Sequence, residues 1–286
     1  MISCVLITFN PNMIQLEKTI NSLISQVDSI IIVKNSSEEI DIQQDKIHFI
    51  QLERNMGIAY AQNRGIEYAI KLDTDFILFS DQDTVYPKDF VNKSILCYKK
   101  HETEKIGAIV PLFYNKNKQQ YSLVSITKTK SILPTIGNEY FVSHAISSGT
   151  ICNKTIFNSI GMMNERLFID WVDAEWCWRL VNQGYKIVCD TNNIIEHTMG
   201  DNFKTFLGRK IVVYSDFRNY YFLRNGTYLL FHSKLLGGKD WLSFWNFMFM
   251  KSLLIFFTNG FSLKRLNLLL KAILKGLTNN FTLENN

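Results

Sequence analysis

The sequence predicts an α/β fold in which a mostly parallel sheet is flanked by helices on both faces. Residues 4–9 (CVLITF) and 29–35 (SIIIVKN) are short apolar runs of the kind that form buried strands. Between them, residues 13–27 place apolar side chains at helical spacing. A helix that joins two buried strands is the unit from which parallel sheets are built.

The same alternation continues along the chain. Residues 46–52 (KIHFIQL) are expected to form a third strand, residues 57–72 a helix, and residues 76–80 (FILFS) a fourth strand. Ligands of such sheets bind outside the carboxyl ends of the strands. Polar side chains follow the expected strands at these ends: Thr8, Asn10, Asn35, Ser36, Ser37, Asp81 and Asp83.

Length and composition favour a globular protein with one main core. The 286 residues are 47% hydrophobic, which is enough for a sizeable core and a small appended unit. The five cysteines are widely spread without any CxxC pair, so neither a disulfide framework nor a thiolate zinc site is expected. The N-terminus (MISCVLITFNP) lacks the basic segment and cleavage site of a secretory signal. We therefore expect the catalytic machinery to be cytoplasmic.

The net charge of +5 is unevenly distributed. Residues 1–202 contain 19 Lys and Arg against 23 Asp and Glu, a balance of −4, whereas residues 203–286 contain 12 against 3, a balance of +9. Aromatic and leucine-rich runs at 241–257 and 263–277 interleave with these basic residues, which favours a lipid surface over nucleic acid.

We expect residues 226–286 to form a basic amphipathic helical region that associates with an anionic membrane. Asn246 and Lys251 interrupt the longer apolar run, which makes attachment in the membrane plane a better expectation than spanning. In the second run, one helical face gathers leucine and isoleucine side chains: Leu263, Leu266, Leu270, Ile273, Leu274 and Leu277. The alternative is that this face forms a homodimer or domain-packing interface.

Two carboxylates one residue apart, Asp81 and Asp83, end the fourth expected strand. Such a pair is suited to a hard divalent cation, which takes oxygen ligands and bridges to phosphates. By itself the pair equally fits a solvated turn that ends a strand. The motifs that accompany the two carboxylates decide between a cation site and a solvated turn.

The motifs that accompany this pair resemble a known family. VLITFNP, VKNSS, NMGIAYAQNRGI and SDQD follow one another in an order similar to the N-terminal half of family 2 inverting glycosyltransferases, which share the Rossmann-like GT-A fold. Residues 147–187, EHTMGD (196–201) and RNYYFLRN (218–225) resemble the bacterial rhamnosyltransferase-like members. The resemblance implies a GT-A domain over residues 1–225, followed by the helical region 226–286.

The resemblance also implies which residues bind the nucleotide-diphosphate sugar donor. They are Thr8, Asn10, Asn35, Asn55, Gly57, Asn63, Arg64, Asp81, Arg218 and Arg224. Asn35 stands where the family contacts the base edge, but Lys34 replaces the acidic residue that usually precedes that position. Lys34 either points into solvent or adds a cation near the ribose and diphosphate.

Metal and catalytic roles follow in the same way. Asp83 and Asp81 would bind Mg²⁺ or Mn²⁺, with His197 as a third ligand. In FIDWVDAEW, Asp173 falls at the position of the general base, flanked by Asp170 and Glu175. These acids also suit the N-terminus of a helix, with Asp170 as its cap. Gly149, Trp171 and Trp176 are expected to contact the acceptor.

The implied reaction is inverting transfer of a sugar to a lipid-linked glycan at the cytoplasmic face of a bacterial membrane, in O-antigen, capsule or cell-wall synthesis. The segment 147–201 favours dTDP-L-rhamnose as the donor. A UDP-sugar transferase, for example a galactofuranosyl or glucosyl transferase, is the alternative within the family. A catalytically silent nucleotide-sugar-binding membrane protein is the alternative outside it.

Overall fold

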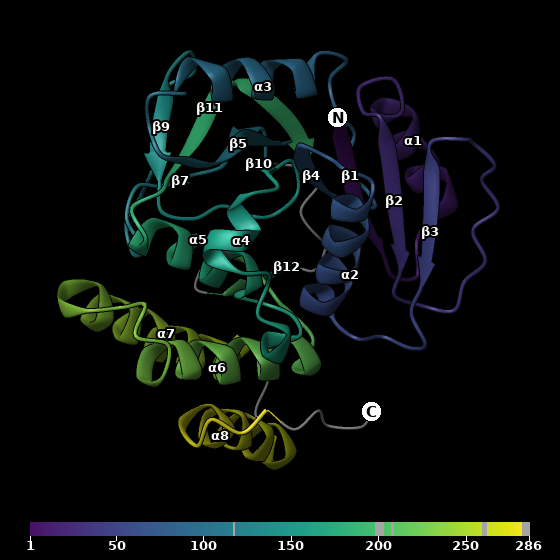
Figure 1. Cartoon of the computed structure of the whole chain (residues 1–286). Helices are drawn as coiled ribbons and strands as arrows, with labels where there is room; N and C mark the ends of the chain where they lie inside the picture. Colours follow the sequence, from purple (N-terminus) through teal and green to yellow (C-terminus); the bar gives the residue numbers. More distant parts are fainter. Residues whose placement is uncertain (117, 198–202, 207–208, 259–261, 282–286) are drawn as a thin grey trace.

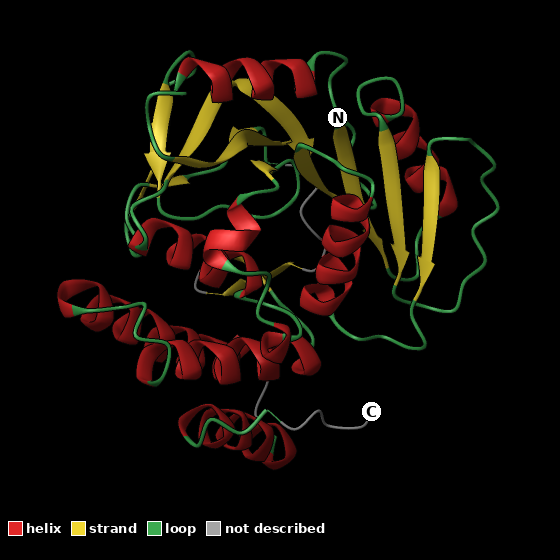
Figure 2. Ribbon diagram, viewed as in Figure 1, coloured by secondary structure: helices red, strands yellow, loops and turns green. Residues whose placement is uncertain are grey.

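A computed structural model describes residues 1–116, 118–197, 203–206, 209–258 and 262–281. Its centre is a nine-stranded sheet with the strand order β3-β2-β1-β4-β10-β5-β11-β9, to which β6 adds beside β5. Figures 1 and 2 show helices packed on both faces of this sheet, with the C-terminal helices beneath it. The predicted mixed, mostly parallel sheet is confirmed.

Six strands of the sheet run in one direction. They are β1 (Ile2–Thr8), β2 (Ser29–Lys34), β3 (Ile47–Gln51), β4 (Phe76–Asp81), β5 (Ile106–Asn115) and β11 (Lys186–His197). The antiparallel strand β10 (Ile151–Asn153) lies between β4 and β5, and β9 (Glu139–Val142) closes the edge beside β11. The short strands β6 (Gln120–Tyr121), β7 (Val124–Ser125), β8 (Ser131–Ile132), β12 (Phe203–Phe206) and β13 (Arg209–Val212) form local antiparallel pairs.

Two sets of helices cover the two faces. Helices α1 (Met13–Leu23) and α3 (Phe90–Lys100) bury side chains such as Leu16 and Phe90 on one face. Helices α2 (Ile58–Lys71), α4 (Ile156–Ile160) and α5 (Val172–Asn182) bury side chains such as Ile66 and Trp176 on the other. The strands and helices expected within residues 4–80 are therefore present, with ends within a few residues of those predicted.

Helix α2 lies unusually close to the sheet because of Gly65. A Cβ atom at this position would lie 2.3 Å from Val5 Cγ1 and 3.3 Å from Val33 Cγ2. Any larger side chain would push the helix away from β1 and β2. This contact sets the distance between the middle of α2 and strands β1 and β2.

The C-terminal helices form a layer of their own. Helices α6 (Asp216–Phe231), α7 (Gly238–Thr258) and α8 (Leu263–Leu277) share a core that includes Tyr221, Phe244 and Leu269. Residue 225, the expected boundary, lies inside α6, and the division into 1–225 and 226–286 stays a prediction. Phe168 and Trp178 from the preceding segments join the same core, which ties this layer to the rest of the fold. Within the described ranges, no helix is long and apolar enough to cross a membrane.

Candidate active site

Polar groups at the ends of β1 and β2 interlock with the loop before α2. Asn35 N donates a hydrogen bond to Thr8 O (2.8 Å), and Asn35 Oδ1 accepts one from Met56 N (2.8 Å). Asn55 Oδ1 accepts hydrogen bonds from Asn35 Nδ2 (3.1 Å) and Gly57 N (3.0 Å). The structure thus brings together Thr8 and Asn35, which were expected at neighbouring strand ends, and Asn55, which the family resemblance implied.

The cradle formed by these strand ends contains an unpaired polar atom. Thr8 is fully buried, and its Oγ1 has no hydrogen-bond partner among the described residues. A buried hydroxyl without a partner costs free energy unless a ligand or water satisfies it. Asn10 lies beside it with a left-handed φ of 47°, and its N–H donates to Ser36 Oγ (3.0 Å). This edge of the sheet therefore offers the Thr8 hydroxyl group to a polar ligand.

The Asp81-Gln82-Asp83 segment is held next to β1 by its middle residue. Gln82 Nε2 donates to Phe9 O (3.1 Å) and Gln82 Oε1 accepts from Phe9 N (2.7 Å). With Gln82 fixed in this way, Asp81 lines a cavity while Asp83 is exposed. A neutral middle residue therefore has a structural function in this motif.

A cavity of about 800 Å³ opens beside these carboxylates. Five charged or polar side chains mark one part of it: Asp81, Asp170, Asp173, Arg218 and Tyr214. The other part is formed mainly by apolar residues of β5, β7, β9 and their loops, together with His144 and Ser125. A cavity with a few convergent polar groups and apolar walls is the usual form of a ligand site.

Asp173 has the most perturbed carboxyl group of the cavity. It lies in the first turn of α5, and its Oδ2 accepts a hydrogen bond from Ser147 N (3.1 Å). Burial by the surrounding protein, and then the nearby negative charge of Asp81, raise the pKa of Asp173 to about 7. A carboxylate whose pKa is close to neutral pH is suited to accept a proton in general-base catalysis.

The backbone that leads into α5 is strained. Phe168, Asp170 and Trp171 have φ values of 65°, 59° and 67°, in the left-handed region that non-glycine residues rarely adopt. Each such residue costs of order 1–3 kcal/mol and persists only where its surroundings enforce it, typically at functional sites.

Two buried residues of α6 enforce this loop conformation. Asn225 Nδ2 donates to the carbonyl groups of Leu167 (2.8 Å), Ile169 (2.8 Å) and Asp170 (3.1 Å). Arg224 Nη2 donates to Leu167 O at 3.1 Å, and the Arg224 side chain is fully buried. Arg224 was expected to bind the donor, but the structure places its guanidinium against the loop backbone instead. Sequence reasoning missed Asn225 as a site residue, although it ends the RNYYFLRN motif.

Asp170 pairs with Arg218 at the mouth of the cavity. Arg218 Nη2 lies 3.0 Å and Nε 3.1 Å from Asp170 Oδ1, and the guanidinium stacks 4.6 Å from the Tyr214 ring centre. The N-cap of α5 is Trp171, without a side-chain capping bond, so the expectation that Asp170 caps this helix is wrong. Arg218 remains exposed enough to meet a phosphate or sugar.

Several residues expected at the site have structural contacts elsewhere. Glu175 pairs with Arg179 (3.0 Å), and Trp176 is buried in the core, where its Nε1 donates to Gly161 O (3.1 Å). Neither lines the cavity. Burial and pairing direct both side chains into the protein, so this geometry does not support their expected roles in catalysis and acceptor contact.

Asn63 and Arg64 are likewise directed away from the cavity. Asn63 Nδ2 donates to Met163 O (3.0 Å) and Glu165 Oε1 (2.8 Å), and Arg64 pairs with Glu67 (2.7 Å) and Glu165 (3.4 Å). They fasten α2 to the segment that precedes the strained loop. The structure gives them a supporting function in place of the expected donor contact.

The two glycines of the expected site are explained by close contacts with the protein itself. A Cβ at Gly57, where φ is 84°, would lie 2.6 Å from Phe168 O, and one at Gly149, where φ is 77°, would lie 2.6 Å from Ile195 Cδ1. Gly149 follows Ser147 and Ser148, and it lets this turn pack on β11. Trp171 does line the cavity, and its Nε1 donates to Phe222 O (3.0 Å).

Ser147 and Ser148 connect the two acidic motifs, which sequence reasoning did not foresee. Ser147 N binds Asp173, and Ser148 Oγ accepts a hydrogen bond from Asp81 N at 3.3 Å. The only sequence signal was their position in the SSGT segment of the family resemblance.

The expected metal ligands are only partly described. Asp81 and Asp83 lie at the end of β4 as predicted, whereas the His197 side chain lies outside the described residues and only its backbone, at the end of β11, is placed. The donor set of two carboxylates near an unpaired Thr8 hydroxyl fits a hard divalent cation with a diphosphate.

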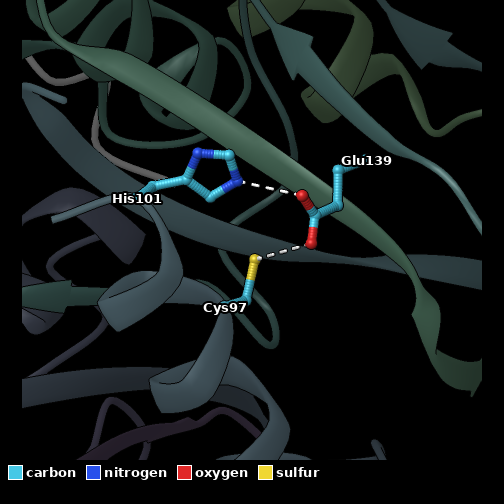
Figure 3. Close-up of side chains that lie close together, drawn as sticks. All are labelled: Cys97, His101 and Glu139. Carbon is cyan, nitrogen blue, oxygen red and sulfur yellow. Dashed lines mark hydrogen bonds and ion pairs between the residues drawn. The ribbon is translucent and has the colours of Figure 1, made fainter. Parts of the chain in front are cut away.

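A different group of side chains is also close enough to hold a metal ion. The ligand atoms of Cys97, His101 and Glu139 all lie within 4.8 Å of one another, where the end of α3 meets β9 (Figure 3). His101 Nε2 lies 2.9 Å from Glu139 Oε2, and Lys100 Nζ lies 2.9 Å from both Glu139 oxygens. Burial, and then Glu139, raise the pKa of the Cys97 thiol to about 12. This group lies outside the cavity, and its charges are balanced as an ion-pair network.

Comparison with known proteins agrees with this geometry. The family model described as glycosyl transferase family 2 matches residues 3–160. The chain is 36% identical over 240 residues to the dTDP-rhamnosyl transferase RfbF of Shigella flexneri, covering 80% of this chain and 79% of the relative. It is 26% identical over 226 residues to the low-salt glycan biosynthesis hexosyltransferase Agl10 of Haloferax volcanii, covering 74% and 72%.

Solved structures show the same fold at low sequence identity. The crystal structure of S. aureus TarS residues 1–349 in complex with UDP-GlcNAc has a TM-score of 0.59 and 15% identity, covering 96% of this chain and 81% of that one. The structure of GalNAc-T7 with UDP, GalNAc and Mn²⁺ has a TM-score of 0.57 and 14% identity, covering 92% and 58%. The sheet and its flanking helices are those of the GT-A fold.

Proposed function

The chain belongs to glycosyl transferase family 2, and from this premise we propose that it transfers L-rhamnose from dTDP-L-rhamnose, with inversion, to a lipid-linked glycan. The observation that carries the chemistry is the position of Asp173, which faces the cavity with its pKa raised to about 7. The observation that favours the donor is the similarity to a dTDP-rhamnosyl transferase over most of both chains.

Asp173 supplies the base that an inverting transfer needs. The acceptor oxygen forms a bond to the anomeric carbon, its proton passes to an oxygen of Asp173, and the bond from that carbon to the diphosphate breaks with its electron pair on the diphosphate. Ser147 N holds Oδ2 at 3.1 Å, which leaves Oδ1 to receive the proton. Clamping of the loop by Asn225 keeps the base in place during the transfer.

The donor is proposed to lie across the ends of β1, β2 and β4. Thr8, Asn35 and Asn55 would meet the nucleoside, and Arg218, which lines the cavity beside Asp170, would meet the diphosphate or sugar. Asp81 and Asp83 would hold Mg²⁺ or Mn²⁺. When bound, such a cation neutralises the charge that develops on the leaving diphosphate.

A donor screen tests the proposed reaction. Purified protein with lipid-linked acceptors extracted from a bacterial polysaccharide pathway is expected to incorporate label from dTDP-L-rhamnose at least about tenfold faster than from UDP-glucose, UDP-galactofuranose or UDP-GlcNAc, since a site built for one sugar rejects others. Faster incorporation from a UDP-sugar would refute the rhamnose donor. Donor binding without transfer to any acceptor would indicate the silent binding protein.

We further propose that α7 and α8 attach the protein to an anionic membrane surface. On one side of α7, the Phe244 ring packs 4.9 Å from Trp171, next to the cavity. On its exposed side, Trp245 and Phe249 stack at 5.7 Å, and α8 exposes Leu270 and Leu274. The leucine face expected on α8 is thus largely exposed, while Leu269, Ala272 and Gly276 pack on the other helices.

Charge makes a membrane the favoured occupant of this surface. Lys264 and Lys271 lie on the exposed part of α8, and the region as a whole is basic. Each basic residue near anionic lipid contributes up to about 1 kcal/mol. A helix that touches both Trp171 and the lipid would place a lipid-linked acceptor next to the cavity.

Point variants test this surface better than truncation, because removing α7 would expose Trp171 and Trp178. The double variant Trp245→Ser and Phe249→Ser is expected to weaken sedimentation with phosphatidylglycerol liposomes by roughly tenfold or more, since about 1.5–3 kcal/mol accompanies burial of each large side chain. Phe49→Ser, an equally exposed aromatic residue on β3, is the control. Equal sedimentation of all three proteins would contradict the proposal, and a change from dimer to monomer would favour the homodimer interface.

A further inference from the structure

His144 lies in the cavity but has no function in the mechanism above. It follows β9, in the segment that leads to Ser147, and it lines the same cavity as Asp173. Trp178, on the helix that carries Asp173, packs edge-on against its ring at 5.7 Å. The imidazole therefore packs against α5, the helix that carries Asp173, and lines the same cavity as Asp173.

The contacts of His144 determine which ring nitrogen carries the proton. Trp178 is fully buried, and its indole Nε1, which is only a donor, points to His144 Nδ1 at 3.3 Å. Nδ1 must therefore present its lone pair, since a buried indole N–H without an acceptor would cost about 1–3 kcal/mol. Ser143 Oγ also lies 3.0 Å from Nδ1, but its hydroxyl donates to Ser125 O (3.1 Å), so the Trp178 indole decides the tautomer. The proton of the neutral ring is consequently on Nε2.

The ring remains neutral near physiological pH. Burial lowers the pKa of His144 to about 4. In the part of the chain that the structure describes, Nε2 makes no hydrogen bond, and it is not a buried atom without a partner. Nε2 is therefore open to the cavity and can donate to a bound molecule.

We propose that His144 is an acceptor-binding residue whose Nε2–H donates a hydrogen bond to a hydroxyl group of the sugar that Asp173 activates. This inference rests on the proposed transfer reaction. A neutral donor on a fixed ring suits a saccharide, because sugar hydroxyl oxygens accept hydrogen bonds and carry no charge. The apolar residues around it, such as Val142 and Val124, exclude water that would compete.

Two substitutions of His144 test the roles of Nδ1 and Nε2 separately. His144→Asn retains an acceptor close to the position of Nδ1 for Trp178 but lacks the Nε2 donor, whereas His144→Gln carries an amide N–H close to the position of Nε2. The Asn variant is expected to raise KM for the lipid-linked acceptor about tenfold, the usual effect of losing one hydrogen bond of this strength. Its KM for the nucleotide-sugar donor should change less than about twofold, and the Gln variant should recover most of the loss.

Monodeoxy analogues of the acceptor identify the contact. With the wild-type protein, removal of one hydroxyl group should raise KM about as much as His144→Asn does, and in the Asn variant the same removal should have little further effect. Unchanged acceptor KM in an active Asn variant, or equal losses in Asn and Gln, would overturn the role of His144. A wild-type protein that transfers no sugar would refute the proposed function instead.

A measurement on the resting protein tests the tautomer without any substrate. Nitrogen-15 NMR of labelled histidine should show His144 with its proton on Nε2 at pH 7, and the signal should disappear in both variants. A proton on Nδ1 would overturn the inference whatever the enzyme transfers.

Discussion

Replacing Asp173 with asparagine is expected to lower kcat by about 100-fold or more, the usual scale for loss of a general base. The amide is similar in size and still accepts the hydrogen bond from Ser147 N, so the loop should not move. KM for the donor should change little, because the proposed mechanism places Asp173 at the acceptor oxygen and not at the donor. Steady-state transfer rates with each substrate varied separately provide the measurement.

The pH dependence adds an independent measurement of the same residue. The base must be ionised, so the wild-type rate should fall below pH about 7, where burial and Asp81 place the pKa of Asp173. Since the folded-state pKa is above the unfolded value of about 3.9, folding stability should decrease as pH rises from about 4 to about 7. Asp173→Asn should remove that decrease.

Two comparisons show whether the effect is specific. Asp240→Asn changes a carboxylate in the first turn of α7, outside the site, and should leave kcat unchanged. Asp170→Asn breaks the pair with Arg218 and should mainly raise KM. If Asp170→Asn abolishes turnover while Asp173→Asn remains active, the base has been assigned to the wrong carboxylate.

The parts of the site that the sequence predicted are those fixed by strand direction. Thr8, Asn35 and Asp81 meet because parallel strands deliver their carboxyl ends to one edge of the sheet. Asp173 was predicted because the resemblance aligns it at the start of a helix. In both cases the position on an element determines where the side chain can reach.

The sequence failed where side-chain direction depends on distant partners. Asn63 reaches Met163 and Glu165, a hundred residues away, and Arg224 reaches the carbonyl of Leu167. Their residue types suit a phosphate ligand equally well, so the motif alone could not distinguish a ligand contact from a loop clamp. His144 was missed for the related reason that its tautomer depends on Trp178.

For the C-terminal helices, too, the sequence did not show which side of a helix packs against its neighbours. The leucine spacing of α8 correctly predicted an amphipathic helix, but small residues decide which side packs. A Cβ at Gly276 would lie 2.4 Å from Arg224 O, so α8 approaches α6 through this glycine and Ala272 and leaves the leucine side exposed. One side of α8 thus packs within the protein, as the domain-packing alternative expects, and attachment of the exposed side to lipid stays a prediction.

Asp83→Asn is expected to lower transfer roughly 100-fold, because it would remove a charged oxygen ligand from the proposed cation, and such cations contribute several kcal/mol to phosphate chemistry. Asp83 is exposed at the end of β4 and makes no described ion pair, so the fold should not change. EDTA should inactivate the wild-type protein similarly, and Mn²⁺ or Mg²⁺ should restore it.

Calorimetric titration of dTDP with Mn²⁺ should show weaker joint binding to the variant, a readout independent of turnover. Asp45→Asn, the same charge change on an exposed loop, should behave like wild type in each assay. Full activity of Asp83→Asn, or of the wild-type protein in excess EDTA, would mean that the paired carboxylates end the strand without holding a metal ion.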